Sequence, residues 1–244
     1  TDWVTLMAML NYTEKEMEHI TFSGGAGTTR LGTFTTESSG IGDTRLSALI
    51  RLLDFGKQTV HVNLGFSLPT GSTDERDSVL TPMGGRLRTR LPYAMQLGSG
   101  TLDFIPGVTY SGKFNLFGWG AQYAGTIRTE KDNDYQRGDQ HIVTGWTSYA
   151  FRDWISLSGR LEFRTMGKIN GRDANIVGPV QTADPNNYGG DRIDLKFGLN
   201  LIGQTGWMRG HRFAIEGGIP LMQDLNGPQM EMDCALTVGW QYAL

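Results

Sequence analysis

The chain has 244 residues, 34 glycines, a single cysteine and a formal net charge of −3. This length fits one or two soluble domains or one barrel of medium size, the small net charge implies no nucleic-acid partner, and a lone cysteine excludes an internal disulfide framework. No stretch approaches the roughly 20 apolar residues of a membrane-spanning helix. A membrane protein built of strands remains compatible with this composition, because the inward half of its side chains is polar.

Segments in which apolar and polar side chains alternate with a period of two predict β-strands. We find about ten, each of about 10 to 14 residues, which is near the roughly 9–11 residues that cross a bilayer at a tilt and longer than ordinary strands. In chain order they lie near residues 2–12, 42–53, 58–68, 100–111, 115–129, 139–152, 154–166, 191–202, 210–220 and 231–244.

The connections between these segments alternate in length, which is typical of transmembrane barrels with short turns on one side and long loops on the other. We therefore predict an all-β, antiparallel up-and-down transmembrane β-barrel that forms a single domain over residues 1–244. The turns that we expect on one side, together with both termini, are 54–57, 112–114, 152–154 and 203–210. The loops that we expect on the other side are 13–40, 69–99, 130–138, 167–190 and 221–230.

The alternation also predicts which side chains face lipid and which face the barrel interior. From residue 155 to residue 164, odd-numbered positions are apolar or glycine, whereas even-numbered positions are polar or charged. In an outer membrane the apolar face meets lipid and the polar face lines the lumen. The charged or titratable candidates for lining the lumen are Arg45, Arg51, His61, Asp103, Arg128, Arg160, Glu162, Arg164, Arg192, Asp194, Lys196, Arg212 and Glu216.

These interior charges have two interpretations, which can coexist. Buried charges must be paired or hydrated, so they could form a structural network that fills the barrel. They could also line a polar path, with a basic excess, for small anionic or aromatic-carboxylate solutes. We expect Arg160 and Arg164 to pair with carboxylates, with Glu162 and Asp194 as partners, because residues two apart on a strand share a face.

The long segment 69–99 is the best candidate for a plug or gate. The alternative interpretation, which we weight equally, is that this segment is a solvated surface loop. Met7 and Met9 are weak candidates for a soft metal site, because thioethers suit Cu(I), but methionine more often fills gaps in packing. No nucleophile elbow and no phosphate-binding loop in its proper context is present. We therefore expect no enzyme activity, no cofactor and no resident metal.

Four stretches resemble the transporter-like outer-membrane proteins grouped as the meta-pathway phenol-degradation family. They are ESSGIGDTRLSALIRL (37–52), GFSLPTGS (65–72), LPYAMQLGSGTLDFIPGVTY (91–110) and QDLNGPQMEMDCALTVGWQYAL (223–244). The resemblance implies a barrel in the outer membrane of a Gram-negative bacterium, with a transport-like role and no catalytic residues. It also implies a further strand pair ahead of residues 1–12, so that ten strands here would be twelve in the native protein.

The sequence thus predicts a bacterial outer-membrane barrel in contact with lipid, which acts as a passive channel or uptake protein for small, aromatic or anionic solutes. The alternative is a closed structural or binding barrel linked to metal handling or to a surface assembly. The two hypotheses differ in whether the lumen is open.

Overall fold

The computed structural model describes residues 3–25, 27–178 and 180–243, and in these ranges the chain forms sixteen strands and four short 3₁₀ helices. The strands are β1 (Val4–Met9), β2 (Tyr12–Phe22), β3 (Arg30–Ile41), β4 (Thr44–Asp54), β5 (Gln58–Leu68), β6 (Arg76–Leu80), β7 (Arg86–Arg90), β8 (Asp103–Phe114), β9 (Phe117–Arg128), β10 (Tyr135–Gln136), β11 (Gln140–Arg152), β12 (Ile155–Met166), β13 (Asn170–Gly171), β14 (Gly190–Ile202), β15 (His211–Leu225) and β16 (Ala235–Tyr242). The 3₁₀ helices are η1 (Ser23–Gly25), η2 (Tyr93–Met95), η3 (Gln181–Ala183) and η4 (Gly206–Met208).

All strand pairs are antiparallel, so the predicted all-β, antiparallel class is confirmed. Ten strands form one curved sheet, in the order β1-β4-β5-β8-β9-β11-β12-β14-β15-β16. We call it the main sheet. Among the described residues, no helix is long and apolar enough to cross a membrane.

The expected count of about ten strands is wrong, because the described chain has sixteen. Six of them lie in connections that we expected to be loops, and they form three two-stranded sheets: β2–β3, β6–β7 and β10–β13. In β2 both faces are polar over most of the length, with Glu14, Glu16 and Glu18 exposed on one face and Lys15 on the other. An apolar–polar alternation therefore could not reveal this strand.

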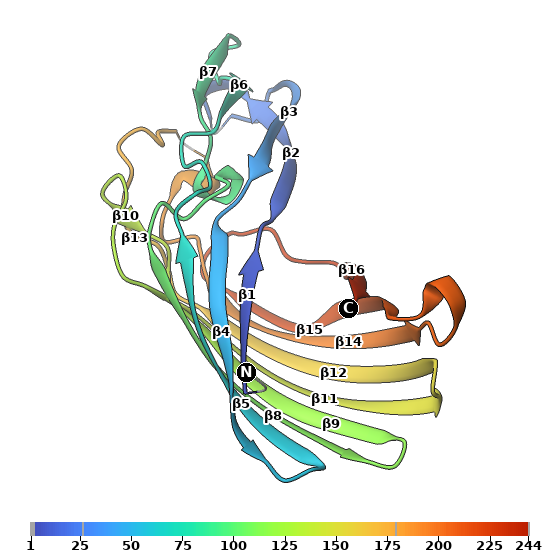
Figure 1. Cartoon of the computed structure of the whole chain (residues 1–244). Coiled ribbons are helices and arrows are strands. Elements are labelled where there is room, and N and C mark those ends of the chain that lie inside the picture. The colour runs from blue at the N-terminus through green and yellow to red at the C-terminus, as the bar shows by residue number, and fades with distance from the viewer. Residues whose placement is uncertain (1–2, 26, 179, 244) are drawn as a thin grey trace.

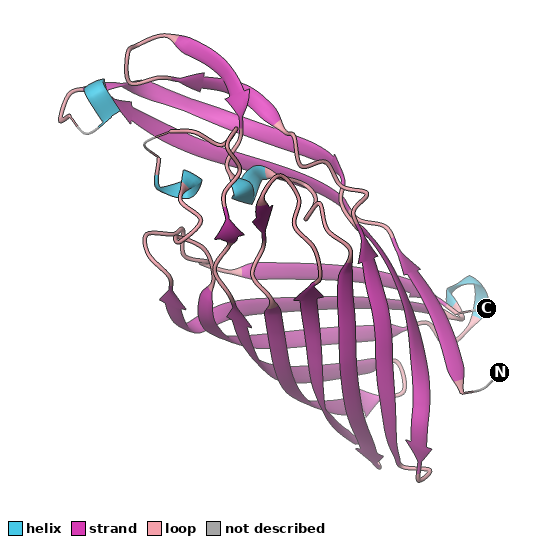
Figure 2. Ribbon diagram, turned by 90° about the vertical axis from the view of Figure 1, so that its left-hand side faces the viewer, coloured by secondary structure: helices cyan, strands magenta, loops and turns pink. Residues whose placement is uncertain are grey.

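The predicted closure of the barrel is not observed. β1 and β16 are the two edges of the main sheet, and within the described ranges each has a partner on one side only. Figures 1 and 2 show a curved wall with a gap between these two strands.

Most apolar side chains of the main sheet point outward, and many of them are exposed. Leu161 and Leu195 lie opposite each other on β12 and β14, and Phe197 follows on the same face with 64% of its surface exposed. Such a face is stable only against lipid or another apolar surface. The polar side chains therefore occupy the opposite face, which we call the inner face.

The well-buried apolar core lies in the long connections, not beneath the main sheet. Tyr93, Tyr135, Ile169, Ile176 and Ala183 form one buried cluster, against which Tyr188 packs. These residues come from segments 91–102, 129–139 and 167–189, which gather at the long-loop end of the main sheet in Figure 1. We call these segments, together with β2, β3, β6 and β7 beyond the same end of the main sheet, the cap.

The short connections of the main sheet all lie at the end opposite the cap, which motivates a labelling prediction. In a variant with the exposed Cys234 replaced by serine, a cysteine in place of Val177 in the cap should react with an impermeant maleimide on intact cells. A cysteine in place of Trp207, beside the β14–β15 turn, should react only after the outer membrane is opened. Both side chains are highly exposed, at 76% and 84%, so accessibility does not favour either. Equal labelling of the two variants on intact cells would contradict the predicted topology.

Candidate functional site

The inner face of the main sheet gathers the charged residues that the sequence singled out. Residues opposite each other on paired strands point to the same face. Arg51 lies opposite His61 on β5, and Asp103 on β8 lies opposite Arg128 on β9. When the pairings are followed from β4 to β15, all thirteen candidates fall on this face. That they line a solute path stays a prediction.

On β12 and β14 the inner face carries three successive layers of like charge. The opposed residues are Arg164 with Arg192, Glu162 with Asp194, and Arg160 with Lys196. Like charges directly opposite each other are destabilising, so compensation must come from the neighbouring layer.

The acidic middle layer supplies that compensation. Glu162 lies 3.0 Å from an amino group of Arg164 and 2.7 Å from the ammonium of Lys196. Nε of Arg192 lies 3.0 Å from the carboxylate of Asp194. The carboxylate of Glu162 therefore forms ion pairs with both Arg164 and Lys196.

The expected pairing of Arg164 with Glu162 is found, but Arg160 has a different partner. Its Nε lies 3.1 Å from Glu216 on β15, two strands away, and its guanidinium stands 5.7 Å from the centre of the Trp146 ring. Gly198 lies between them on β14, opposite Glu216, and carries no side chain to obstruct the contact. Asp194, the other expected partner, pairs with Arg192 on its own strand instead.

The remaining candidates are scattered over the inner face. Arg128 pairs with the fully buried Asp103 at the cap end, and Arg51 pairs with Asp54 at 3.0 Å. Arg212 donates to the neutral side chain of Asn200 at 2.7 Å. Arg45 has no ion pair within the described ranges.

That Met7 and Met9 form a soft metal site stays a hypothesis. Met7 and Met9 share the inner face with Ser47 and Arg45, their opposite residues on β4. In the part of the chain that the structure describes, no three His, Cys, Asp or Glu side chains are grouped closely enough to hold a metal ion.

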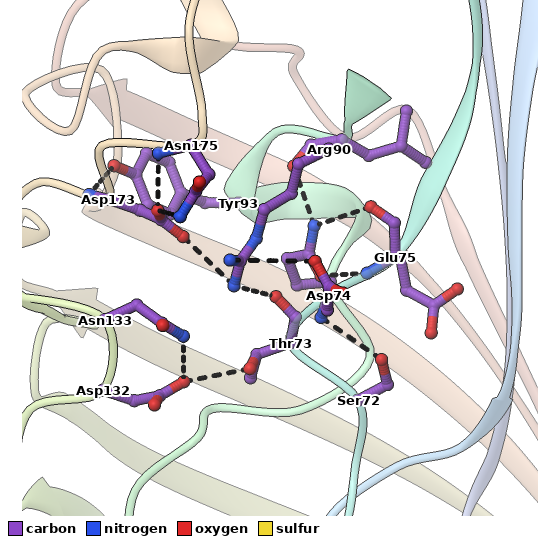
Figure 3. A network of polar contacts seen from close by, with 12 residues as sticks. Ser72, Thr73, Asp74, Glu75, Arg90, Tyr93, Asp132, Asn133, Asp173 and Asn175 are labelled. Atoms are coloured by element: carbon purple, nitrogen blue, oxygen red, sulfur yellow. Dashed lines mark hydrogen bonds and ion pairs between the residues drawn. The ribbon is translucent and has the colours of Figure 1, made fainter. Parts of the chain in front are cut away.

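A buried ion pair joins two parts of the cap. Arg90, at the end of β7, lies 3.1 Å from Asp173, and both side chains are almost completely buried, at 6% and 1% exposed. Arg90 also donates to the carbonyl of Thr73, and Asp173 accepts two bonds from Asn175, at 2.8 and 3.0 Å (Figure 3). Breaking such a pair by removing one partner is strongly destabilising.

Two further cations donate hydrogen bonds to backbone carbonyl groups within η2 and in the residues just after it. Arg137 donates to the carbonyls of Tyr93, Gln96 and Gly98, at 3.1, 3.2 and 2.9 Å. Lys15 on β2 donates to Ala94 and Gln96, both at 2.7 Å. Burial, and then the charge of Arg137, lower the pKa of Lys15 to about 8.

The cap core excludes water. Tyr93 contacts Tyr135 and Tyr188 edge to face, with ring centres 4.8 and 5.6 Å apart. Burial raises the pKa of Tyr188 to about 12. Sequence reasoning missed these residues, although the apolar run Leu91–Met95 inside a polar segment was a usable signal.

Two cavities open at opposite ends of the inner face. The larger, of about 590 Å³, lies at the short-turn end and is lined by Lys57, Lys113, Trp146 and Arg152, among others. The smaller, of about 380 Å³, lies at the cap end between Met166, Arg192, Leu225 and segment 229–232.

The curved antiparallel sheet, with an apolar outer face and a charged inner face, is the fold of an outer-membrane β-barrel protein. The model of the family described as "Putative MetA-pathway of phenol degradation" matches residues 16–205, and the chain therefore belongs to this family. The resemblance expected from sequence is confirmed.

The first of two solved structures that resemble the chain shows the fold. An outer membrane channel from Pseudomonas putida F1 matches with a TM-score of 0.62 at 16% identity, over 99% of this chain and 77% of that one. OmpT, an outer membrane protein of Vibrio cholerae, matches with a TM-score of 0.42 at 11% identity, over 93% of this chain and 64% of that one. No curated protein matches the chain in sequence. At the level of the fold, the expected bacterial outer-membrane protein is confirmed.

Proposed function

We propose that the chain forms an outer-membrane channel through which small anionic solutes pass along the inner face. The observation that carries this proposal is the charge of that face. Of the thirteen candidates that share it, eight are arginine or lysine and four are aspartate or glutamate, with His61 as the thirteenth. A wall with one sign of charge in excess raises the local concentration of ions of the opposite sign.

The excess is not cancelled by local pairing. Arg164 and Lys196 share the single charge of Glu162, and Arg212 is bonded to an uncharged amide. Arg45 has no ion-pair partner in the described ranges. The candidate cations lie on β4, β9, β12, β14 and β15, and we propose that anions pass along them.

The proposal includes closure of the main sheet into a barrel within the membrane. An unpaired strand edge in lipid leaves backbone groups unsatisfied, at several kcal/mol for each group. We infer that a further strand pair covers the edges of β1 and β16, which gives an even number of strands. A stable single-channel conductance requires such closure, so the measurement below tests it as well.

The solute class is proposed from chemistry and from the family. Trp146 offers an aromatic face next to the guanidinium of Arg160, an arrangement that suits a flat anion. The family description names phenol degradation. Small aromatic anions are therefore the solutes that we propose, carried passively and without catalysis.

The folded cap favours a second candidate, a barrel whose long-loop end is closed at rest. A dry cluster of three tyrosines and a buried Arg90–Asp173 pair are features of a fixed lid, not of a solvated loop. Such a barrel would bind solutes without conducting until the cap moves.

Ion selectivity in planar lipid bilayers separates these functions. We expect the purified protein in a KCl gradient to give a reversal potential of the sign for chloride preference. The double substitution Arg45→Gln and Arg212→Gln should move this potential towards zero, because it removes two uncompensated charges. Arg86→Gln, at the exposed start of β7, is the matched control and should change nothing. Cation preference in the unaltered protein would contradict the proposed function, and a silent protein that still binds anions would favour the closed barrel.

A further inference from the structure

The smaller cavity, at the cap end of the inner face, is partly open and has one side held in place by hydrogen bonds. We call it the mouth cavity. Its volume of about 380 Å³ is within the range of small-molecule sites. Its roof is segment 229–232, which two glutamine side chains hold in place. Gln223 exchanges two hydrogen bonds with the backbone of Met232, at 3.0 and 2.9 Å, and Gln229 donates to the carbonyls of Gly189 and Asn226, at 2.7 and 2.9 Å.

Two guanidinium groups lie next to each other in the wall of this cavity. Arg164 and Arg192 are directly opposed on β12 and β14, and both line the cavity. Arg164 contacts Glu162, and Arg192 contacts Asp194. Glu162 also pairs with Lys196, so its single charge compensates two cations only in part. Nε of Arg164 is buried and has no hydrogen-bond partner among the described residues. Each guanidinium has five N–H donors, so several remain available to an anion in the cavity.

Four of the other lining residues are apolar. Met166, Met230, Met232 and Leu225 contribute thioether and aliphatic surface. Three thioethers alone would suit Cu(I), but two adjacent guanidinium groups repel a metal cation. The same thioethers pack well against hydrocarbon, because methionine fills irregular apolar space.

Two glycines at and just before the start of β14 allow the backbone segments around the cavity to approach one another closely. Gly189 and Gly190 line it and adopt φ values of 82° and 128°, which favour glycine. A side chain on Gly190 would also collide with the carbonyl of Asp224, at 2.3 Å from the position of its Cβ. Substitution of either glycine should therefore disturb the backbone around the cavity.

We propose that the mouth cavity is a binding site for a small monocarboxylate with an apolar tail. Arg164 and Arg192 donate charge-assisted hydrogen bonds to the carboxylate, and such bonds are stronger than hydrogen bonds between neutral groups. The methionines and Leu225 contact the tail.

One lining residue, Glu231, carries a negative charge and is expected to weaken the binding of an anion. Glu231, in the roof, is exposed and also lines the cavity. Its carboxylate repels a bound anion, and it disfavours dianions such as phosphate more than monoanions. Removing this charge should therefore strengthen binding, whereas removing an arginine should weaken it.

The site would take up solutes at the entrance of the path, so its biological role rests on the proposed function, although its affinity can be measured independently. We expect isothermal titration of the whole protein in dodecyl maltoside micelles to show binding of sodium hexanoate beyond that of empty micelles. Hexanamide, its neutral analogue, and acetate, which lacks the tail, should each bind at least about tenfold more weakly.

Substitutions of the charged lining residues test their effect on binding, and each is chosen so that the protein should still fold. Arg164→Gln should weaken hexanoate binding by at least about tenfold, and it is expected to fold because Glu162 keeps Lys196 as a partner. The double substitution Arg192→Gln and Asp194→Asn removes both members of a pair, so it leaves no isolated buried charge, and it should weaken binding as much. Glu231→Gln should tighten binding. Arg209→Gln, an exposed arginine at the other end of the molecule, is the matched control and should bind normally.

Absence of hexanoate binding, equal binding of hexanamide, or unchanged binding by Arg164→Gln would each overturn the proposal, as would weaker binding by Glu231→Gln. The proposed function can fail separately. Hexanoate binding by a protein without anion-selective conductance would leave this site intact and refute the channel. Anion-selective conductance without hexanoate binding would refute this site alone.

Discussion

Leu195→Arg should prevent the protein from inserting into lipid. Leu195 belongs to the exposed apolar face and lies opposite Leu161 near the middle of β12. A cation at the midplane of a membrane barrel costs about 2–4 kcal/mol, and this is a large fraction of the stability of an ordinary protein. Refolding into phosphatidylcholine vesicles, followed by the electrophoretic shift of the folded form, measures the effect.

The matched control is Ser156→Arg, on the inner face of β12. Ser156 lines the larger cavity, where an added arginine can reach water. We expect this variant to refold nearly as well as the unaltered protein. If the two arginine variants refold equally, the assignment of the outer face to lipid is wrong.

Asp173→Asn should unfold the cap without unfolding the main sheet. The substitution leaves Arg90 charged and buried, with only the more distant and exposed carboxylate of Asp74, at 3.8 Å, as an ion partner. Removing one partner of a buried pair typically costs about 3–5 kcal/mol. The cap has a core of its own, so the damage should stay local. Limited trypsin digestion of the refolded protein should then cleave at Arg90, which is buried in the unaltered protein, and more readily at the partly buried Arg137.

A compensating variant distinguishes the lost charge from lost packing. Arg90→Met combined with Asp173→Leu removes both charges and should restore resistance to trypsin, since apolar residues of similar volume often replace a buried pair without loss. If the cap closes the path, single-channel conductance should rise in Asp173→Asn and fall again in the double variant. Unchanged digestion of Asp173→Asn would show that the pair does not hold the cap together.

The strands of the main sheet were predictable because lipid imposes a simple rule on them. Each must show apolar side chains on one face and may show polar ones on the other, so the period of two is visible in the sequence. The expected segment 154–166 became β12 (Ile155–Met166), and 191–202 became β14 (Gly190–Ile202). Only the strand at residues 2–12 differed much, because it divides into β1 and the start of β2.

The cap could not be predicted, because its strands and its core obey no such rule. β2 and β3 carry polar residues on both faces for most of their length, so neither face gives a signal. The buried tyrosines come from three connections that are far apart in sequence, and nothing local indicates that they meet. In the same way, same-strand spacing predicted the contact of Arg164 with Glu162, but the contact of Arg160 with Glu216 depends on the curvature of the sheet across Gly198.

Electrostatics alone does not fix the alignment of β12 against β14, because the charged residues that lie opposite each other have the same sign. If β14 slipped by two residues, Arg164 would face Asp194 and Glu162 would face Lys196, which are attractive pairs, and the apolar face would be unchanged. No tight turn prevents this slip, because residues 167–189 join the two strands. The cap does prevent it, since Tyr188 is packed against Tyr93 two residues before β14 begins at Gly190. The cap therefore does more than cover one end of the barrel, because its packing also fixes which residues of β12 and β14 lie opposite each other.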